Sequence, residues 1–531
     1  MEKTIQHIQL TINMRCHTLL LLITLLFFNN VVTSQTLEDL FQHKKEVYFK
    51  FKFQSVNKTN NLSNIISIDH KTNKEYVYAY ATKNEFKAFL KCGIAYELVD
   101  EIIPQHTHLS VSKNNWDYYP TYSEYTQMME QFADSFPNIC KLHNLGTLSS
   151  GRKILCVQIS SNVGVKSNKP SFLYTSSMHG NELTGYVLML RLIDDILSGY
   201  NTVSEYTQIV NQVDLWINPL ANPDGAYASG NQTISGATRG NANGVDLNRN
   251  YPDPQNGSNP DGNAWQEETV IFMDLADSVQ FDMSCNIHTG AEVFNYPWDT
   301  WSRLTADDVW WRNIASQYAD TAHAQSSAGY FNDLNNGVTN GWDWYEVNGG
   351  RQDFMNYFRF CKESTLELSS NKIPNPTTLP YYWNANKRSL VNYIKQSLNG
   401  LRGLVTDSIT GLPLQARVEI IGHDVDSSHV YSRAVVGNYH RYLSAGNYQV
   451  SFSKNGYYNK TIDVNVVDDQ VVIHDVQLVP VNTVLIKDIN EGELKIINTF
   501  DILGRKTPLQ WNSIYLQHMS DGTVQKLMKI K

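Results

Sequence analysis

The sequence predicts an α/β protein with a β-rich addition at each end. From about residue 116 to residue 400, apolar strand-like runs alternate with helical patterns, as in a sheet covered by helices on both faces. Before this stretch lie two strand-like runs and one helical pattern, and after residue 400 the chain changes to short strands divided by turns. At 531 residues the chain is too long for one ordinary domain. We therefore expect a central α/β domain, a small N-terminal α+β region and C-terminal β-sandwich domains.

The composition is that of a folded protein. Hydrophobic residues make up 42% and charged residues 18% of the chain, which is enough for a sizeable core and excludes global disorder. The formal net charge of −9 gives no reason to expect nucleic acid as a partner.

Residues 1–34 have the features of an export signal. Lys3 and Arg15 supply positive charge, residues 18–28 form a short apolar run, and small residues precede Gln35. The apolar run is too short to span a bilayer, and no later run has that length. We expect an exported mature chain without a transmembrane segment; passage through the periplasm to the outside or the cell surface is implied by a resemblance of residues 481–531 that is described below.

The cysteines do not form a disulfide-dense pattern. Cys16 would leave with the signal, and five others remain, an odd number without the spacing of a zinc site. They leave room for one bridge, such as Cys140 to Cys156.

Residues 35–112 are expected to form the N-terminal α+β region. Residues 46–53 alternate apolar and polar side chains with period two, as a half-buried strand does. Residues 76–80 predict a second strand, and residues 84–91 predict a helix. A propeptide-like role and a plain structural extension both remain open for this region.

The central domain, residues 113–400, is expected to begin with a helix over residues 123–136. Its strand-like runs are residues 153–159, 171–174, 213–218, 283–287 and 361–368. In open α/β sheets, functional side chains gather at the carboxyl ends of strands. His179, Asn218, His288 and Glu367 all lie at or just beyond such ends.

A candidate metal motif lies at one of these strand ends. His179 and Glu182 follow the apolar run of residues 171–178 and precede a helical pattern over residues 183–197. Zinc binds imidazole nitrogen and carboxylate oxygen, and a catalytic site usually has three protein ligands. Alone the pair is weak, because such pairs are common at solvated helix starts. A third ligand must come from elsewhere in the chain.

Four further sequence blocks help to interpret the pair of His179 and Glu182. His179-Gly-Asn-Glu182 is followed by Asn218-Pro-Leu-Ala-Asn-Pro-Asp-Gly225, then by residues 239–252, which include Asn248-Arg249, and by residues 288–299 and 345–367. In this order, over roughly residues 113–400, the blocks resemble the zinc metallocarboxypeptidases of the carboxypeptidase A and B type. The resemblance implies a mixed-sheet catalytic domain, one zinc ion per chain and removal of residues from the C-termini of peptides or proteins.

The resemblance also implies roles for the zinc centre. It assigns the zinc to His179, Glu182 and His288, and the general base to Glu367. A buried Glu between Leu366 and Leu368 would otherwise need a partner.

Further residues are implied around that centre. Arg239 matches the arginine that stabilises the developing oxyanion. Asn248, Arg249 and Tyr345 match the residues that bind the substrate's free carboxylate. Asp246 matches a carboxylate that orients the first zinc histidine, the alternative being an ordinary turn residue.

Two residues follow the regulatory (N/E) branch of this family. Asp299, eleven residues after His288, matches the acidic residue that faces a basic C-terminal side chain, and Gln352 follows the same branch. A preference for C-terminal Lys or Arg is therefore implied, since an apolar substrate would leave a buried carboxylate unpaired. The alternative is that Asp299 caps a turn and the pocket is broad.

The C-terminal part resembles two further modules. Residues 401–480 resemble the transthyretin-like β-sandwich of the regulatory branch, and residues 481–531 resemble the C-terminal sorting domain of the Bacteroidetes type IX secretion system. The second resemblance implies export machinery as a partner, and its alternative is one more small β-domain.

Two other functions compete with a secreted zinc carboxypeptidase. One is an inactive relative that only binds peptide C-termini. Such relatives usually lose a zinc ligand or the general base, and here His179, Glu182, His288 and Glu367 are all present. The other is a zinc amidase acting on cell-wall peptides. It would not require the Asn248-Arg249 pair, although murein peptides also end in a carboxylate.

Overall fold

The computed structural model describes residues 36–42, 44–63, 65–69, 75–99, 116–481, 496–519 and 522–529. The expected export signal, residues 1–34, lies outside the described residues. The chain divides into two compact units with the boundary between Leu478 and Val479.

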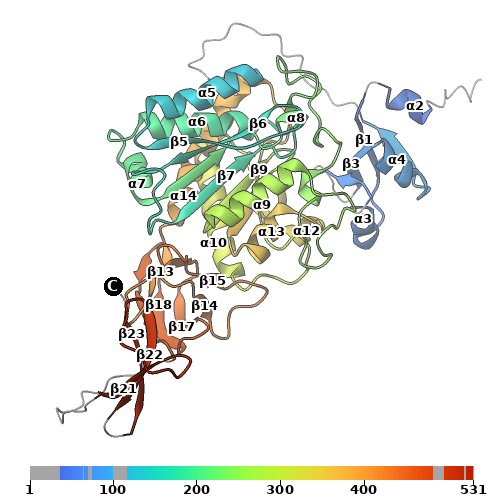
Figure 1. Cartoon of the computed structure of the whole chain (residues 1–531). Coiled ribbons are helices and arrows are strands. Elements are labelled where there is room, and N and C mark those ends of the chain that lie inside the picture. The colour runs from blue at the N-terminus through green and yellow to red at the C-terminus, as the bar shows by residue number, and fades with distance from the viewer. Residues whose placement is uncertain are drawn as a thin grey trace, which may run out of the picture. The chain divides into compact units, whose positions relative to one another are not determined.

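An eight-stranded mixed sheet forms the centre of the first unit, with the strand order β11-β10-β12-β9-β7-β8-β6-β5 (Figure 1). The strands are β5 (Cys140–Thr147), β6 (Lys153–Ile159), β7 (Ser171–Ser176), β8 (Asp214–Asn218), β9 (Met283–His288), β10 (Glu292–Tyr296), β11 (Val338–Asn340) and β12 (Lys362–Leu368). The inner strands β8, β7, β9 and β12 are mutually parallel, whereas β5, β6 and β10 add antiparallel pairs. The inner strands therefore end at one edge of the sheet.

Helices cover both faces of this sheet, as the alternation of the sequence predicts. On β7, Phe172 and Tyr174 face one apolar core and Leu173 faces the other. The first core contains side chains of α5 (Tyr122–Ser135), α6 (Thr184–Ser198), α7 (Ser204–Gln212), α10 (Asp308–Gln325) and α14 (Leu379–Gln396). The second contains side chains of α9 (Glu267–Val279) and α13 (Arg351–Phe358). Shorter elements are α8 (Pro223–Ala226), η1 (Leu247–Arg249), α11 (Asp333–Gly337), α12 (Gly341–Trp344) and η2 (Pro376–Thr378). The prediction of an α/β fold is confirmed.

The N-terminal region is a small sheet with helices. Its strands are β1 (Glu46–Lys52), β2 (Ser67–Ile68), β3 (Tyr76–Thr82) and β4 (Tyr96–Leu98), in the order β2-β3-β1-β4, and its helices are α2 (Leu37–Leu40), α3 (Val56–Ser63) and α4 (Lys83–Leu90). Val47, Phe49 and Phe51 of β1 are buried, as period-two alternation requires. Their apolar core also includes Tyr345 and Val347 of the central domain.

Residues 400–478 form a β-sandwich. Its strands are β13 (Gly400–Asp407), β14 (Arg417–Ile420), β15 (Val430–Tyr431), β16 (Asn438–Arg441), β17 (Gly446–Ser453), β18 (Lys460–Val466), β19 (Val471–Ile473) and β20 (Val476–Leu478). One sheet has the order β16-β13-β19 with β20 also paired to β13, and the other has the order β15-β14-β17-β18. Leu401 and Val405 of the first sheet share a core with Val418 and Phe452 of the second.

The second unit, from Val479, contains a three-stranded sheet. It is formed by β21 (Ile496–Asp501), β22 (Ser513–Met519) and β23 (Val524–Lys529) in antiparallel order.

The open question of a disulfide is answered for the described cysteines, all of which are free. Across the β5–β6 pair, Cys140 lies opposite Ile159 and Cys156 lies opposite His143, so the two thiols are not aligned for a bridge.

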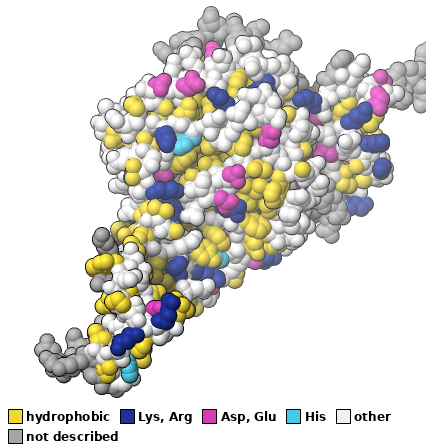
Figure 2. Space-filling model, in the orientation of Figure 1, with side chains coloured by type: hydrophobic (Ala, Val, Ile, Leu, Met, Phe, Trp, Pro, Cys, Tyr) yellow, Lys and Arg dark blue, Asp and Glu magenta, His cyan; other side chains and the backbone are white. Residues whose placement is uncertain are grey.

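Two properties of the chain bear on its contact with membranes and with charged partners. Within the described residues, no helix combines the length and apolar character needed to cross a membrane. On the face drawn in Figure 2, basic and acidic side chains are interspersed and do not gather by charge.

Candidate zinc site

Three candidate metal ligands meet at the carboxyl edge of the sheet. His179 follows β7, Glu182 precedes α6, and His288 ends β9, the parallel neighbour of β7. The segment between the first two comes so close to α8 that a Cβ on Gly180 would lie 2.3 Å from the carbonyl carbon of Gly225. Only glycine permits this approach, which turns both ligands toward His288.

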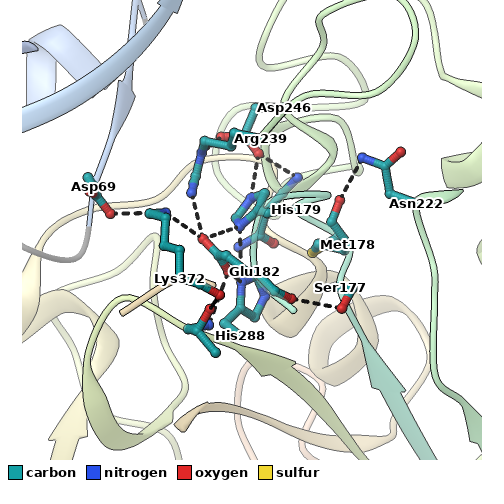
Figure 3. A network of polar contacts seen from close by, with 12 residues as sticks. Asp69, Ser177, Met178, His179, Glu182, Asn222, Arg239, Asp246, His288 and Lys372 are labelled. Carbon is teal, nitrogen blue, oxygen red and sulfur yellow. Dashed lines mark hydrogen bonds and ion pairs between the residues drawn. The ribbon is translucent and has the colours of Figure 1, made fainter. Parts of the chain in front are cut away.

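The donor atoms of the three side chains converge (Figure 3). The Nδ1 atoms of His179 and His288 lie 3.1 Å apart, and the Glu182 carboxylate oxygens lie 3.1 Å and 2.8 Å from them. Ligands bound tetrahedrally to zinc at about 2.0–2.1 Å are about 3.3 Å from one another. Two imidazole nitrogens and a carboxylate are also a typical donor set of catalytic zinc, so these residues fit one zinc ion.

Neighbouring side chains keep the ring nitrogens ready for a metal. His179 Nε2 lies 2.9 Å from Asp246 Oδ1, and because a carboxylate only accepts, the proton is on Nε2 and the lone pair is on Nδ1. The side-chain nitrogen Nδ2 of Asn286 lies 2.7 Å from His288 Nε2, but an amide nitrogen donates, so this contact differs from the one that Asp246 makes with His179. Burial lowers the pKa of His288 to about 4, which keeps this ring neutral and able to bind a metal.

Arg239 joins this centre through two of its nitrogens. Nε donates to Asp246 Oδ2 at 3.0 Å, and Nη1 donates to Glu182 Oε1 at 3.1 Å. Among the described residues, Nη2 of this buried guanidinium has no hydrogen-bond partner. The third nitrogen is therefore available to an oxygen of a bound molecule.

Glu367 lies beside His288, its partner in the parallel pairing of β12 with β9. It is fully buried. Burial, followed by the charge of Glu182, raises the pKa of Glu367 to about 8. A carboxyl group with a pKa near neutrality can both accept and return a proton.

The candidate carboxylate clamp is attached to the same centre. The backbone N–H of Asn248 donates to Asp246 Oδ1 at 2.9 Å, and Arg249 Nη1 donates to the Asn248 carbonyl at 2.9 Å. Among the described residues, Nε and Nη2 of buried Arg249 have no partner. Arg249 lines a cavity of about 400 Å³. Tyr345 lies directly after α12 and is buried. It is close enough to Arg249 and Arg239 for both positive charges to lower its pKa, although burial raises that pKa by more.

Asp299 and Gln352 meet beside the clamp. Asp299 Oδ1 accepts from Gln352 Nε2 at 3.0 Å and from Asn295 Nδ2 at 3.1 Å. A Cβ on Gly350 would lie 3.6 Å from Asp299 Oδ2 and 3.7 Å from Asn248 Oδ1, so Asp299 adjoins the clamp. Burial raises the pKa of Asp299 to about 7, although Asn295 and Arg249 partly oppose the shift.

All eleven site residues predicted from the sequence thus lie together, but three of their supports were missed. Asn286 could have been suspected, because it lies two residues before His288 on the same strand face. Lys372, whose Nζ lies 2.7 Å from Glu182 Oε1, has no local sequence feature. The third, Asp353, accepts the backbone N–H of Asp299 at 3.1 Å and of Thr300 at 2.8 Å.

Lys372 affects the charge state of a ligand. Burial alone would raise the pKa of Glu182, but the charges of His179 and Lys372 outweigh it and hold that pKa well below its usual value. The ligand carboxylate is therefore ionised at neutral pH, as metal binding requires.

The N-terminal region covers one side of this centre. The carboxylate of Glu46 accepts the backbone N–H of Arg239 at 2.5 Å and of Gly240 at 3.3 Å. Asp69 lies 3.3 Å from Lys372 Nζ (Figure 3), and the ring of Tyr80 lies near Lys372, at 4.8 Å, and Arg239, at 5.8 Å.

The contact between Asp246 and His179 predicts an effect on metal affinity. Replacing Asp246 by Asn removes the negative charge beside His179 and sets an NH2 donor against one of its present hydrogen-bond donors, so the acceptor that fixes the proton on Nε2 is weakened and we expect zinc affinity to fall by roughly 10- to 100-fold. Competition with a chromophoric chelator measures it. Asp277→Asn removes a surface carboxylate paired with Arg359 and should leave the affinity unchanged. Equal affinities for both variants would contradict the role of Asp246.

The chain is similar to known carboxypeptidases. Residues 125–389 match the family described as zinc carboxypeptidase. The chain is 35% identical over 355 residues to carboxypeptidase D of Mus musculus, covering 64% of this chain and 25% of that protein. It is 31% identical over 410 residues to carboxypeptidase E of Caenorhabditis elegans, covering 68% of this chain and 86% of that protein.

A solved structure agrees in fold. The crystal structure of carboxypeptidase A from Helicoverpa armigera is 18% identical, with a TM-score of 0.52, and the match covers 66% of this chain and 98% of that one. The chain spans about a quarter of the length of the carboxypeptidase D relatives and most of the carboxypeptidase E relative. The chain belongs to the zinc carboxypeptidase family.

Proposed function

We propose that this protein is a zinc metallocarboxypeptidase that releases single C-terminal residues, preferentially Lys or Arg, from peptides or proteins. The observation that carries the proposal is the placement of Arg249 next to the zinc ligands. Its buried guanidinium has two nitrogens without a partner among the described residues, and it is joined through Asn248 to Asp246, which binds His179. A guanidinium in this state fits a substrate carboxylate.

The proposed mechanism divides the work among the side chains. His179, Glu182 and His288 would hold the zinc ion, which would supply a Lewis acid for the scissile carbonyl and for a water molecule. Glu367 takes the proton of the attacking water and gives it to the leaving amine. Arg239 Nη2 donates to the carbonyl oxygen as negative charge develops on it.

The clamp explains why only the last residue would be removed. Asn248, Arg249 and Tyr345 bind the terminal carboxylate, so the peptide bond next to it lies at the zinc. An internal segment of a chain has no carboxylate to place there.

Asp299 supports the preference for a basic side chain. One of its oxygens is held by Asn295 and Gln352, and the other lies close to Gly350, beside the clamp. Because its pKa is raised to about 7, a cation in the pocket would be paired with a carboxylate that binding itself helps to ionise.

A release assay tests activity and specificity together. Peptides that end in Arg, Lys, Phe or a murein stem sequence are incubated with the wild type, with and without chelator, and with the Glu367→Gln variant. We expect chelator to abolish release, and Glu367→Gln to keep its zinc but lose roughly 10²- to 10⁴-fold in rate. Tight binding without zinc-dependent release would instead indicate an inactive binding protein, and release from the murein peptide alone would indicate the cell-wall enzyme.

The same assay examines Asp299. We expect Asp299→Ala to lower the ratio of kcat/KM for Arg over Phe peptides by roughly 30-fold or more, because the cation loses its buried partner. In the wild type, KM for the Arg peptide should fall as pH rises through about 7, where Asp299 becomes charged. Asp343→Ala, on the exposed part of α12, is the control. An unchanged ratio in Asp299→Ala would favour a broad pocket.

We further propose that residues 35–112 act as an inhibitory propeptide. Glu46, Asp69 and Tyr80 contact Arg239 or Lys372, and the N-terminal core includes Tyr345, so this region lies where a substrate would approach.

Cleavage between the N-terminal region and the central domain tests this. With a protease site inserted between residues 99 and 116, we expect activity to rise at least tenfold after cutting and dissociation. The same site inserted after Val481 should change activity little. Equal activity before and after the first cut would make residues 35–112 a structural extension.

We propose, finally, that residues 1–34 and 481–531 direct export, the latter as a type IX sorting domain, and that the β-sandwich is transthyretin-like. The separation of Val479–Lys531 as its own compact unit is consistent with a removable tail. Deleting residues 481–531 should leave active enzyme in the periplasm, measured by fractionation. Undiminished export would leave the tail as another small β-domain.

A further inference from the structure

We propose that the β-sandwich positions the specificity loop, residues 299–307, and so helps to select the substrate side chain. This inference rests on the proposed role of Asp299 and extends it to a domain that contributes no residue to the zinc centre. The loop runs from Asp299 to Asp307, which immediately precedes α10. Its contacts with the β-sandwich lie at both its middle and its end.

The strongest contact is at the end of the loop. Arg441 of β16 is fully buried and donates from Nη1 and Nη2 to the two carboxylate oxygens of Asp307, both at 2.9 Å. His423 Nε2 lies 2.9 Å from the same carboxylate, and Lys362 Nζ lies 2.6 Å from it. Arg441 also pairs with Asp424.

This cluster has the properties of a structural anchor. Asp307, His423 and Asp424 are close enough together to suggest a metal site. The positive charges of Arg441 and Lys362 already occupy the Asp307 carboxylate, and they would repel a cation. Burial alone would raise the pKa of Asp307, but those two charges outweigh it and lower it strongly. The planar fork of Arg441 thus fixes the direction in which the loop ends.

The middle of the loop is held by a second pair. Arg303 donates to both oxygens of Asp426, at 2.8 Å and 2.9 Å, and its guanidinium lies 3.6 Å from the ring centre of Trp301. Trp301 in turn packs against Trp298 at 5.2 Å and Tyr357 at 5.6 Å. Asp426 is therefore connected through Arg303 and Trp301 to Trp298, which precedes Asp299 in the sequence, and to Tyr357 of α13.

The opposite wall of the pocket also contacts the β-sandwich. Helix α13 carries Gln352 and Asp353, and Asp353 holds the backbone N–H groups of Asp299 and Thr300. Two residues after α13, Phe360 packs against His429 at 4.8 Å and Tyr431 at 5.0 Å. The segments that carry Asp299 and Gln352 are thus both fixed to the same domain, whereas the candidate zinc ligands lie just after β7, just before α6 and at the end of β9.

A matched pair of variants tests the proposal. Asp426→Asn removes the contact to Arg303, and Asp469→Asn removes a β-sandwich contact to Gln317 and Gln396 on α10 and α14, away from the loop. We expect Asp426→Asn to raise KM for an Arg-ending peptide by about two- to five-fold, the effect of an exposed ion pair, with kcat, zinc content and melting temperature unchanged. Asp469→Asn should leave KM unchanged.

A double-mutant cycle shows whether the effect passes through the pair. Arg303→Ala and the double variant should raise KM by the same factor, because Asp426 has no effect once Arg303 is absent, and Asp426→Ala alone should raise KM by no more than that, because Arg303 keeps its contact with Trp301. Arg441→Lys, which keeps the charge but loses the fork, should raise KM further. The outcomes separate the two proposals. A wild type without preference for Arg overturns the proposed specificity, and a wild type whose preference survives Asp426→Asn and the double variant overturns the role of the β-sandwich.

Discussion

The carboxylate of Asp246 is the interaction on which the site depends. One of its oxygens binds His179 Nε2 and the backbone N–H of Asn248, and the other binds Arg239 Nε. A single side chain thus fixes a candidate zinc ligand, the start of the candidate clamp and the arginine for which we propose a role in stabilising developing charge. Burial alone would raise the pKa of Asp246, but Arg239 and His179 outweigh it and keep the group ionised. An amide could not accept all three hydrogen bonds with the same strength.

Burying so many charges is tolerable because they are paired. Glu182 and Asp246 are negative, and Arg239 and Lys372 are positive, with each cation in contact with at least one of the carboxylates. Isolated ions in this environment would shift their pKa values and lose their charge. Glu367 differs in its protonation, because burial and the like charge of Glu182 outweigh the opposing effects of His288 and Lys372, and its pKa rises. The same centre therefore contains ionised carboxylates, which are suited to binding a metal, and a carboxyl group with a raised pKa, which is suited to transferring a proton.

Much of the fold could be predicted because it depends on local patterns. Apolar runs such as residues 171–174 and the alternation in residues 46–52 are properties of neighbouring residues, and both became strands. His179 and His288 were assigned to one metal ion by the family resemblance, and the parallel strands β7 and β9, which end at one edge, bring the two residues together. Lys372 and Asp353 were missed, since each acts on a residue more than 50 positions away through a contact that leaves no local trace. The contacts of Glu46 and Asp69 with the site were missed for the same reason.

The approach of Gly180 to Gly225 limits which substitutions the chain can accept near the zinc centre. A side chain on either residue would collide with a neighbouring loop, since the Cβ of Gly180 would meet the backbone at Gly225, and the Cβ of Gly225 would lie 2.7 Å from the carbonyl oxygen of Gly240. The segments around Gly180, Gly225 and Gly240, which carry His179, Glu182 and Arg239, are therefore in backbone contact, and a side chain on any of these glycines would force a neighbouring segment to shift. The surroundings of Asp299 are confined in the same way, because a Cβ on Gly341 would collide with the Asp299 carboxylate.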